Sequence, residues 1–217
     1  MPPLRDDLAG QSPYGAPQLD VRARLNVNEN PFAPSPELAR AMGDAVANAA
    51  SELNRYPDRD ATALRHDLAE YLMRESGGSL TADHVWAANG SNEILQTIFL
   101  ACGGAGRKAI GFTPSYSVHP LIARITGTEW IAGSRDDDFG INISEAVTQI
   151  SDLKPSLIFI TTPNNPTGTA TSIDDLATLA ECAGRVGALL VVDEAYAEFS
   201  QIKSAVTLLD KFPHILI

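Results

Sequence analysis

The pattern of apolar and polar residues changes at about residue 80. Before that point, residues 1–34 form a Pro-rich N-terminal arm without helical periodicity, and we expect this arm to lie on another surface. Ser35 followed by Pro36 predicts a helix that reaches about residue 50. Asp60 can cap a second helix, in which leucine recurs every fourth residue until two glycines end it.

Beyond residue 80, short apolar runs alternate with helical segments. Strands are predicted at 85–88, 109–112, 128–132, 156–161, 188–192 and 214–217. Helices are predicted at 93–101 and 115–125, and a third begins at a capping box over 172–175. Strands this apolar have to be covered on both faces, which predicts a mainly parallel sheet flanked by helices, an α/β fold.

In such a sheet, ligands bind beyond the carboxyl ends of the strands, so the residues that follow each strand are the informative ones. Gly90, Ser91 and Asn92 stand between a predicted strand and the helix it starts. Glycine allows a tight turn, and a helix N-terminus offers free N–H groups to a phosphate. The alternative is a plain capped turn.

Two further strand ends carry an aromatic ring and an amide. Tyr116 follows the strand at 109–112, where its ring can stack on a flat ligand or belong to the core. Asn165 lies between two prolines, and the following Pro166 holds it out of helical geometry, which would fix the aim of its amide. A turn rich in turn-forming residues is the alternative for this loop.

The strand at 188–192 ends in two acids and a phenol, Asp193, Glu194 and Tyr196. A carboxylate at the end of a buried strand is costly unless a cation or hydrogen-bond donors meet it. We therefore expect a positive group to face Asp193, either a ligand or an arginine of the chain such as Arg135 or Arg185. Glu194 projects differently and is expected to support the loop.

Together the strand ends describe one ligand. Phosphate donors, a platform for a flat ring, polar donors and an anion fit a phosphorylated, cationic, aromatic ring with a phenolic oxygen, and pyridoxal 5'-phosphate is such a ring. A carboxylate about 4 Å from the ring nitrogen, at an effective dielectric near 20, is worth roughly 4 kcal/mol, on the order of three pKa units in favour of the protonated ring. A protonated ring is the better electron sink.

Composition narrows the function further. The 217 residues are 44% hydrophobic and 20% charged, and 27 acidic residues outnumber 16 basic ones. One large domain, alone or with a small appendage, is therefore expected, and the acidic balance would repel nucleic acid and anionic membranes. No apolar run approaches the roughly 18 residues of a membrane span, and no secretory signal is visible, so we expect a cytoplasmic protein. The cysteines and histidines lack metal-ligand spacing, so no metal site is expected.

The order and spacing of four strings resemble the fold type I aminotransferases, which use pyridoxal phosphate. The strings are Asn-Gly-Ser-Asn-Glu at 89–93, Pro-Ser-Tyr at 114–116, Pro-Asn-Asn-Pro-Thr-Gly at 163–168 and Asp-Glu-Ala-Tyr at 193–196. Stretches at 24–31, 53–58 and 86–93 are similar to the histidinol-phosphate aminotransferases, especially those of actinobacteria. The resemblance runs from the arm to the last residue.

The resemblance implies a role for each candidate residue. Asp193 would pair with the protonated pyridine nitrogen, Asn165 and Tyr196 would hydrogen-bond the ring oxygen, and Tyr116 would stack on the ring. Gly90, Ser91 and Asn92 would hold the phosphate. In a homodimer, Tyr56 would reach the phosphate of the neighbouring subunit, with the Tyr-Pro turn as the alternative. Tyr14 matches a position near the substrate, or else anchors the arm.

The chain departs from the family in its lysines. The family requires a lysine that carries the cofactor as a Schiff base and then acts as general acid and base. None of the four lysines here, Lys108, Lys154, Lys203 and Lys211, stands at the carboxyl end of a strand. The family lysine follows the next strand, and a C-terminal small domain with substrate-binding arginines comes later. We therefore expect residues 35–217 to be an incomplete large domain, truncated before the last strands and the small domain, without a catalytic lysine of its own.

Several functions follow as hypotheses. The first is a fragment of a histidinol-phosphate aminotransferase, which exchanges an amino group between histidinol phosphate and 2-oxoglutarate in histidine biosynthesis and is inactive alone. The second keeps the fold but acts on an aromatic amino acid. The third is a non-catalytic protein that binds pyridoxal phosphate weakly or serves in dimerisation. A nucleotide-binding domain is disfavoured, because neither a G-x-G-x-x-G nor a Walker loop is present.

Overall fold

The computed structural model describes residues 3, 5–10, 15 and 17–217. The chain divides into two units. We call Met1–Leu8 with Ala63–Ile217 the sheet unit, and Ala9–Thr62 the N-terminal unit. Each is described by itself.

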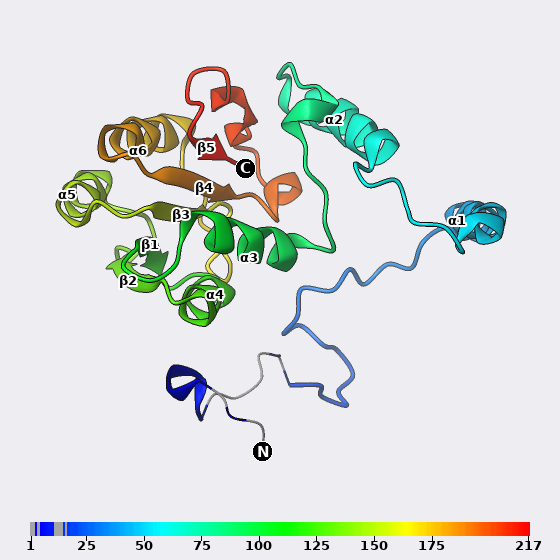
Figure 1. Cartoon of the computed structure of the whole chain (residues 1–217), viewed down its shortest axis with the longest axis horizontal. Coiled ribbons are helices and arrows are strands. Elements are labelled where there is room, and N and C mark those ends of the chain that lie inside the picture. The colour runs from blue at the N-terminus through cyan, green and yellow to red at the C-terminus, as the bar shows by residue number, and fades with distance from the viewer. Residues whose placement is uncertain (1–2, 4, 11–14, 16) are drawn as a thin grey trace. The chain divides into compact units, whose positions relative to one another are not determined.

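The sheet unit is built on five parallel strands (Figure 1). In spatial order they are β2 (Glu129–Ser134), β1 (Lys108–Thr113), β3 (Leu157–Thr161), β4 (Leu189–Asp193) and β5 (Ile215–Leu216). The register places Thr161 of β3 beside Asp193 of β4, so these two strands end at the same level. This arrangement confirms the predicted parallel α/β sheet.

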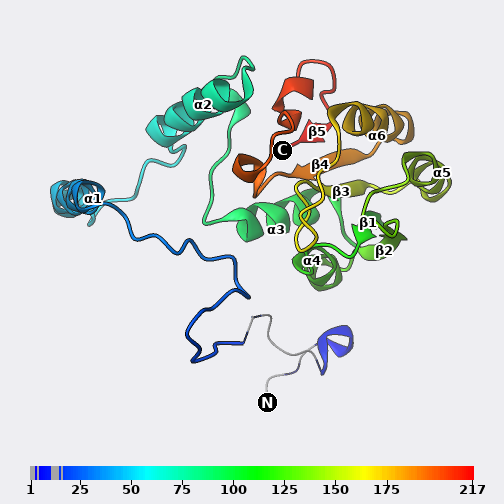
Figure 2. The same ribbon diagram turned by 180° about the vertical axis from the view of Figure 1, so that it is seen from behind.

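Helices cover both faces of this sheet, as the views from the front and from behind show (Figures 1 and 2). On one face lie α3 (Ser91–Cys102) and α4 (Val118–Thr126), and on the other α5 (Ile143–Leu153) and α6 (Ile173–Val186). Alternate strand residues serve the two faces. In β3, Leu157 and Phe159 pack towards α3 and α4, whereas the isoleucines between them and after them pack towards α5 and α6. The central strands β1, β3 and β4 are thus buried on both sides, as their apolar runs require.

The remaining helix of the sheet unit is α2 (Thr62–Ser76), whose Ala69 packs against Leu80 and Val206. The capping residue differs from the prediction, because Asp58 rather than Asp60 accepts a hydrogen bond from the N–H of Thr62, at 2.7 Å. Short 3-10 helices complete the described structure: η1 (Asp6–Leu8), η2 (Ala50–Glu52), η3 (Ala82–His84), η4 (Ala197–Phe199) and η5 (Ala205–Leu208).

The N-terminal unit contains α1 (Pro36–Ala49), which begins as predicted. The Ser35 hydroxyl accepts a hydrogen bond from the N–H of Leu38 at 3.1 Å, and Pro36 occupies the first turn. No helix or strand forms from 17 to 35, and every side chain from 17 to 60 is exposed. That the arm lies on another surface stays a prediction.

One predicted element is wrong, and one helix was not predicted. Residues 85–88 form no strand, because no strand of the described chain pairs with them, and an apolar run without a hydrogen-bonding neighbour stays coil. Helix α5 was not predicted, although Asn142 caps it and Ile143, Ala146 and Ile150 recur on one face. No helix among the described residues is long and apolar enough to cross a membrane.

Candidate active site

Five of the predicted residues line one open cavity at the carboxyl ends of β1, β3 and β4. Its lining consists of Ser91, Tyr116, Thr161, Asn165, Asp193, Ala195 and Tyr196. About 340 Å³ of space free of protein atoms lies between these residues, part of it open to solvent. All seven residues belong to the sheet unit, so the cavity is complete within one unit.

Asp193 is the last residue of β4, and its side chain is 10% exposed. Its Oδ2 lies 3.2 Å from Nε2 of His119, and its Oδ1 accepts a hydrogen bond from the N–H of Ala195 at 3.2 Å. Neither Arg135 nor Arg185 is its partner within the described chain, so the alternative of an internal arginine is wrong, and His119 lies there instead. A carboxylate offers about four lone-pair positions, so Asp193 can accept a further hydrogen bond from a ligand in the cavity.

His119, the contact of Asp193, is a residue that the sequence reasoning missed. It is 2% exposed and comes from the first turn of α4, three residues after Tyr116. Its ring stacks on Phe159 with centroids 4.9 Å apart and meets the edge of Tyr116 at 5.4 Å. The sequence held no local signal for it, because Tyr116 precedes the helix that bears His119.

The first turn of α3 carries the three predicted phosphate ligands, of which only Ser91 lines the cavity. Gly90 is the N-cap with φ of +82°, a conformation that favours glycine, and it leaves the N–H groups of the first turn pointing beyond the helix. The amide of Asn92 accepts a hydrogen bond from the Tyr116 hydroxyl at 3.2 Å. Asn92 therefore contacts the predicted ring platform rather than the cavity itself.

The loop after β3 assigns different tasks to its two asparagines. Asn164 is 2% exposed and hydrogen-bonded on all sides, whereas Asn165 lines the cavity and its amide makes no hydrogen bond to another residue of the described chain. The peptide bonds preceding Pro114, Pro163 and Pro166 are cis. The amide of Asn165 is thus available to a ligand.

The loop after β4 is held by Glu194. Its Oε2 accepts a hydrogen bond from the Ser204 hydroxyl, and its Oε1 accepts one from the N–H of Ala205, both at 2.6 Å. Burial raises the pKa of the Glu194 carboxyl, against the effect of these two donors. The expectation that Glu194 supports the loop is confirmed.

The same loop is tied at a second point. The Tyr71 hydroxyl, from α2, donates a hydrogen bond to Oε1 of Glu198 at 2.8 Å, and this bond raises the pKa of Tyr71. Tyr196 lies between the two tied points and lines the cavity.

The two remaining predicted residues are not part of this cavity. Tyr56 belongs to the N-terminal unit and is fully exposed, and Tyr14 lies outside the described residues. None of the four lysines lines the cavity, and Lys203 lines a smaller hollow beside Glu194. The cavity therefore contains groups that can bind a phosphorylated ring, but no amine among the described residues.

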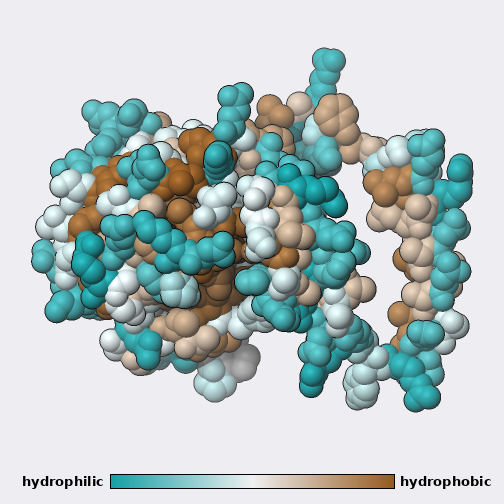
Figure 3. All heavy atoms as spheres, turned by 90° about the horizontal axis from the view of Figure 1, so that it is seen from above, coloured by the Kyte–Doolittle hydropathy of each residue, from teal (hydrophilic) through white to brown (hydrophobic). Residues whose placement is uncertain are grey.

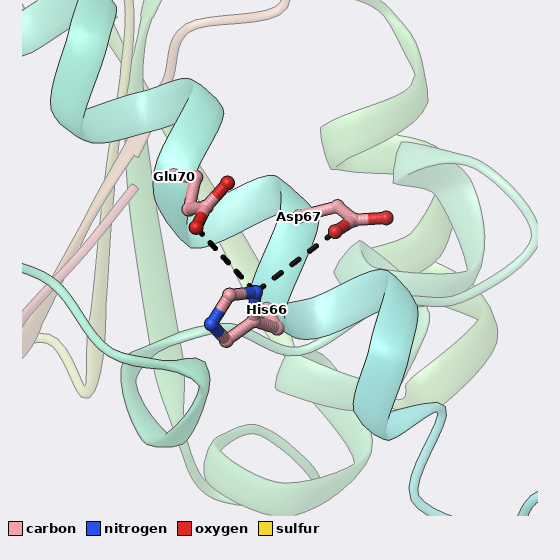
Figure 4. A group of neighbouring side chains, drawn as sticks. All are labelled: His66, Asp67 and Glu70. Atoms are coloured by element: carbon pink, nitrogen blue, oxygen red, sulfur yellow. Dashed lines mark ion pairs between the residues drawn. The ribbon is translucent and has the colours of Figure 1, made fainter.

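One cluster of potential metal ligands occurs elsewhere in the described chain (Figure 4). His66 Nδ1 on α2 lies 3.9 Å from an oxygen of Asp67 and 3.8 Å from one of Glu70. All three side chains are exposed on one helix surface, where such pairs are ordinary ion pairs. We assign no metal to them.

The comparison with known families decides the class. The family described as aminotransferase class I and II matches residues 23–217. The chain belongs to this family. Its cavity thus lies in an aminotransferase sheet, at the strand ends where the predicted residues meet.

The relatives narrow the likeness within the family. The chain is 56% identical over 217 residues to a histidinol-phosphate aminotransferase of Thermobifida fusca and 54% identical over 215 residues to one of Mycolicibacterium smegmatis. Each match covers 99% of this chain but only 57% and 56% of the respective relative. The chain therefore spans about half the length of these curated relatives.

Solved structures agree with the fold. A putative histidinol-phosphate aminotransferase of Erwinia carotovora atroseptica superimposes with a TM-score of 0.77 at 26% identity, covering 94% of this chain and 57% of that one. The histidinol-phosphate aminotransferase of Sinorhizobium meliloti, solved in complex with pyridoxal-5'-phosphate, gives a TM-score of 0.70 at 23% identity, covering 87% and 49%. The second likeness shows the fold alone.

Proposed function

We propose that the cavity of the sheet unit binds pyridoxal 5'-phosphate and that the chain has the function of a histidinol-phosphate aminotransferase. The observation that carries the proposal is the convergence of Ser91, Tyr116, Asn165, Asp193 and Tyr196 on one cavity, in a chain 51–56% identical to proteins of that name. These side chains come from loops up to about a hundred residues apart in the sequence, and a chance meeting would not bring five of the predicted ring and phosphate partners together.

Each group would have one task in binding. Asp193, already oriented by His119 and Ala195, would accept a hydrogen bond from the ring nitrogen. Asn165 and Tyr196 would donate to the ring oxygen, and Tyr116 would cover one ring face. The first-turn N–H groups of α3 and the Ser91 hydroxyl would hold the phosphate. When bound, the cofactor supplies an electron sink for the carbon that loses its proton.

The described residues that line the cavity would orient the ring but would not move the substrate proton. That step requires a base at the reacting carbon, and no lysine of the described chain lines the cavity. We therefore expect the 217-residue chain to bind the cofactor and to transfer amino groups slowly by itself.

A homodimer completes the proposal. Tyr56 is fully exposed, and the segment from 17 to 60 buries no side chain. In a dimer this segment would be covered, and Tyr56 would reach the phosphate bound by the neighbouring copy. The proposed substrates are histidinol phosphate and 2-oxoglutarate, with glutamate as the product of the second.

Binding is tested with pyridoxamine 5'-phosphate, which needs no lysine. Isothermal titration of the chain should give one site per chain, and Asp193→Ala should abolish most of the affinity. Asn142→Ala, which removes the cap of α5 and does not touch the cavity, is the matched control and should bind as well as the parent chain. A parent chain that does not bind this compound would sink the proposed function.

The substrate is tested separately. Amino transfer to 2-oxoglutarate is measured from histidinol phosphate and from phenylalanine, with and without added ethylamine as an external base. We expect a rate that rises with the amine and is higher for histidinol phosphate. A higher rate with phenylalanine would mean that an aromatic amino acid, not histidinol phosphate, is the substrate. A rate that does not rise with ethylamine would contradict the idea that transfer is slow because a base is lacking.

A further inference from the structure

Asn164 is a buried polar residue that neither the sequence motifs nor the proposed binding roles explain. Its side chain is 2% exposed and does not line the cavity. A buried amide that had no partner would cost free energy, and here every polar group has one. The Nδ2 group donates to the carbonyl of Pro114 at 3.0 Å and to the hydroxyl of Thr167 at 2.8 Å, and Oδ1 accepts from the Ser115 hydroxyl at 2.7 Å.

These contacts join two different loops. Thr167 belongs to the same loop as Asn164, but Pro114 and Ser115 belong to the loop that follows β1. The Ser115 hydroxyl also lies 3.2 Å from the hydroxyl of Thr161, the last residue of β3. The side chain of Asn164 is therefore the centre of a hydrogen-bond network that crosses between the ends of two neighbouring strands.

Each joined loop places its next residue in the cavity. Tyr116 follows Ser115 directly, Asn165 follows Asn164 directly, and both line the cavity. The distance between the ring of Tyr116 and the amide of Asn165 therefore depends on the hydrogen-bond network, because each of these residues is one position away from a member of it. A shift of either loop would misplace one ligand-binding group relative to the other.

The chemistry of the network requires an amide. Only an asparagine of this length offers two donors and an acceptor from one planar group. An aspartate would keep the contact with Ser115 but would place a carboxylate against the carbonyl of Pro114. A glutamine would add a methylene group to a site without space.

We propose that Asn164 is a positioning residue, which fixes the loop bearing Tyr116 against the loop bearing Asn165 and so keeps the cavity in the shape of a flat ring. The inference rests on the proposed function, because the ligand whose binding reports the shape is the proposed cofactor. Asn164 itself touches no ligand and acts through its two neighbours.

A double-mutant cycle separates positioning from general stabilisation. Pyridoxamine 5'-phosphate is titrated calorimetrically into the parent chain, Asn164→Ala, the double variant Tyr116→Ala with Asn165→Ala, and the triple variant. Asn164→Ala should weaken binding about tenfold in the parent but by less than about twofold when Tyr116 and Asn165 are already truncated. Equal losses in both backgrounds, or no loss in the parent, would overturn the inference.

The control for stability is Asn142→Ala, which also removes a side-chain hydrogen bond to the backbone, to the N–H of Glu145 at 3.2 Å. It should lower stability without changing the dissociation constant. If Asn164→Ala does not fold, Ser115→Ala replaces it in the same cycle, because it removes one bond that crosses between the loops. The expected loss is then smaller, about threefold, with the same dependence on the background.

Hydrogen exchange provides a readout without any ligand. Asn164→Ala should accelerate amide exchange in both loops, at 113–118 and at 162–168, whereas Asn142→Ala should leave both unchanged. Acceleration confined to 162–168 would contradict the link between loops. A parent chain that fails to bind pyridoxamine 5'-phosphate would end the proposed function, while the exchange result would still decide whether Asn164 joins the two loops.

Discussion

The loops after β3 and β4 both line the cavity and are both held in place by a polar side chain, but the side chains differ. In each, two neighbouring polar residues divide the tasks of lining the cavity and holding the loop. In the loop after β3, Asn164 holds and Asn165 faces the cavity, and in the loop after β4, Asp193 faces the cavity and Glu194 holds. The first loop is held by an uncharged amide, and the second by a carboxylate whose pKa is raised by burial.

This difference has a physical consequence for the two walls of the cavity. An amide does not titrate, so the hold on the loop after β3 is independent of pH. A buried carboxylate does titrate, so the hold on the loop after β4 changes with its protonation. The two walls should therefore respond differently to the same change of pH.

The largest expected effect comes from removing the carboxylate of Asp193, the residue of the loop after β4 that faces the cavity. Asp193→Ala should lower the affinity for pyridoxamine 5'-phosphate by up to about 1,000-fold, because a charge pair worth roughly 4 kcal/mol is lost. Isothermal titration measures the change. Asp193→Asn, which keeps the shape and an acceptor, should retain part of the affinity. An alanine variant within about threefold of the parent would show that Asp193 does not contact the ring nitrogen.

The next largest effect comes from removing the side chain of Asn164, which holds the loop after β3 in place. Asn164→Ala should reduce the free energy of unfolding by about 2–3 kcal/mol, because it removes the hydrogen bonds of the buried amide to the Pro114 carbonyl and to the hydroxyls of Ser115 and Thr167. Urea denaturation should give the same loss at pH 5 and pH 8. A loss that depends on pH would contradict a network of uncharged groups.

A smaller effect sharpens the contrast through Glu194→Gln. Because the folded pKa of Glu194 is raised, the folded state binds more protons than the unfolded state once the pH exceeds the ordinary value of 4.5. The parent therefore loses stability as the pH rises from that value through the raised pKa, and the neutral glutamine does not.

Urea denaturation from pH 4 to pH 8 should show the stability of Glu194→Gln, relative to the parent, rising with pH and then levelling off. The nearby Glu198 adds to the raised pKa, so Glu198→Gln should reduce the pH dependence of the parent without removing it. A difference between Glu194→Gln and the parent that is constant over this range would show that Glu194 titrates alike in both states.

The smallest effect concerns the second tie of the loop after β4. Tyr71→Phe removes the hydroxyl that donates to Glu198, in an exposed position where such a bond adds little to stability. Urea denaturation should not separate it from the parent. Ultraviolet titration should nevertheless lose one tyrosine that ionises above its ordinary pKa, and Glu198→Gln should lower that pKa instead. An unchanged titration in both variants would mean that this bond does not form in solution.

The cavity residues that directly follow a strand could be predicted from the sequence with a single rule. The carboxyl ends of parallel strands meet at one edge, so Tyr116, Asn165 and Asp193 could be grouped without knowing the order of the strands. His119 could not be found in this way, because a histidine among apolar residues of a helix resembles a core residue. Its pairing with Asp193, 74 positions away, depends on how α4 crosses the sheet.

The differences between the predicted and the observed elements have different causes. Residues 85–88 have the composition of a strand, but strand formation also requires a hydrogen-bonding neighbour, which composition does not report. For α5, the local signals of Asn142 and the apolar spacing were both present and could have been combined. The choice of Asp58 over Asp60 as the cap of α2 depended on backbone geometry in the turn.

Apolar groups of the sheet unit also remain open to solvent. The exposed large side chains include Trp86, Leu100 and Phe199, and apolar atoms are visible on one face of the unit in Figure 3. Such groups favour association between copies of the chain.

Near the cavity, an indole is already in place. Gly111 leaves room on β1 for the ring of Trp130 from β2, since a Cβ at that glycine would meet the ring at 2.6 Å. The ring centroid of Trp130 lies 6.3 Å from that of His119, the partner of Asp193. The chain thus has a built-in optical reporter: a ligand that perturbs Asp193 should change the emission of Trp130, whereas the exposed Trp86 should contribute a constant background.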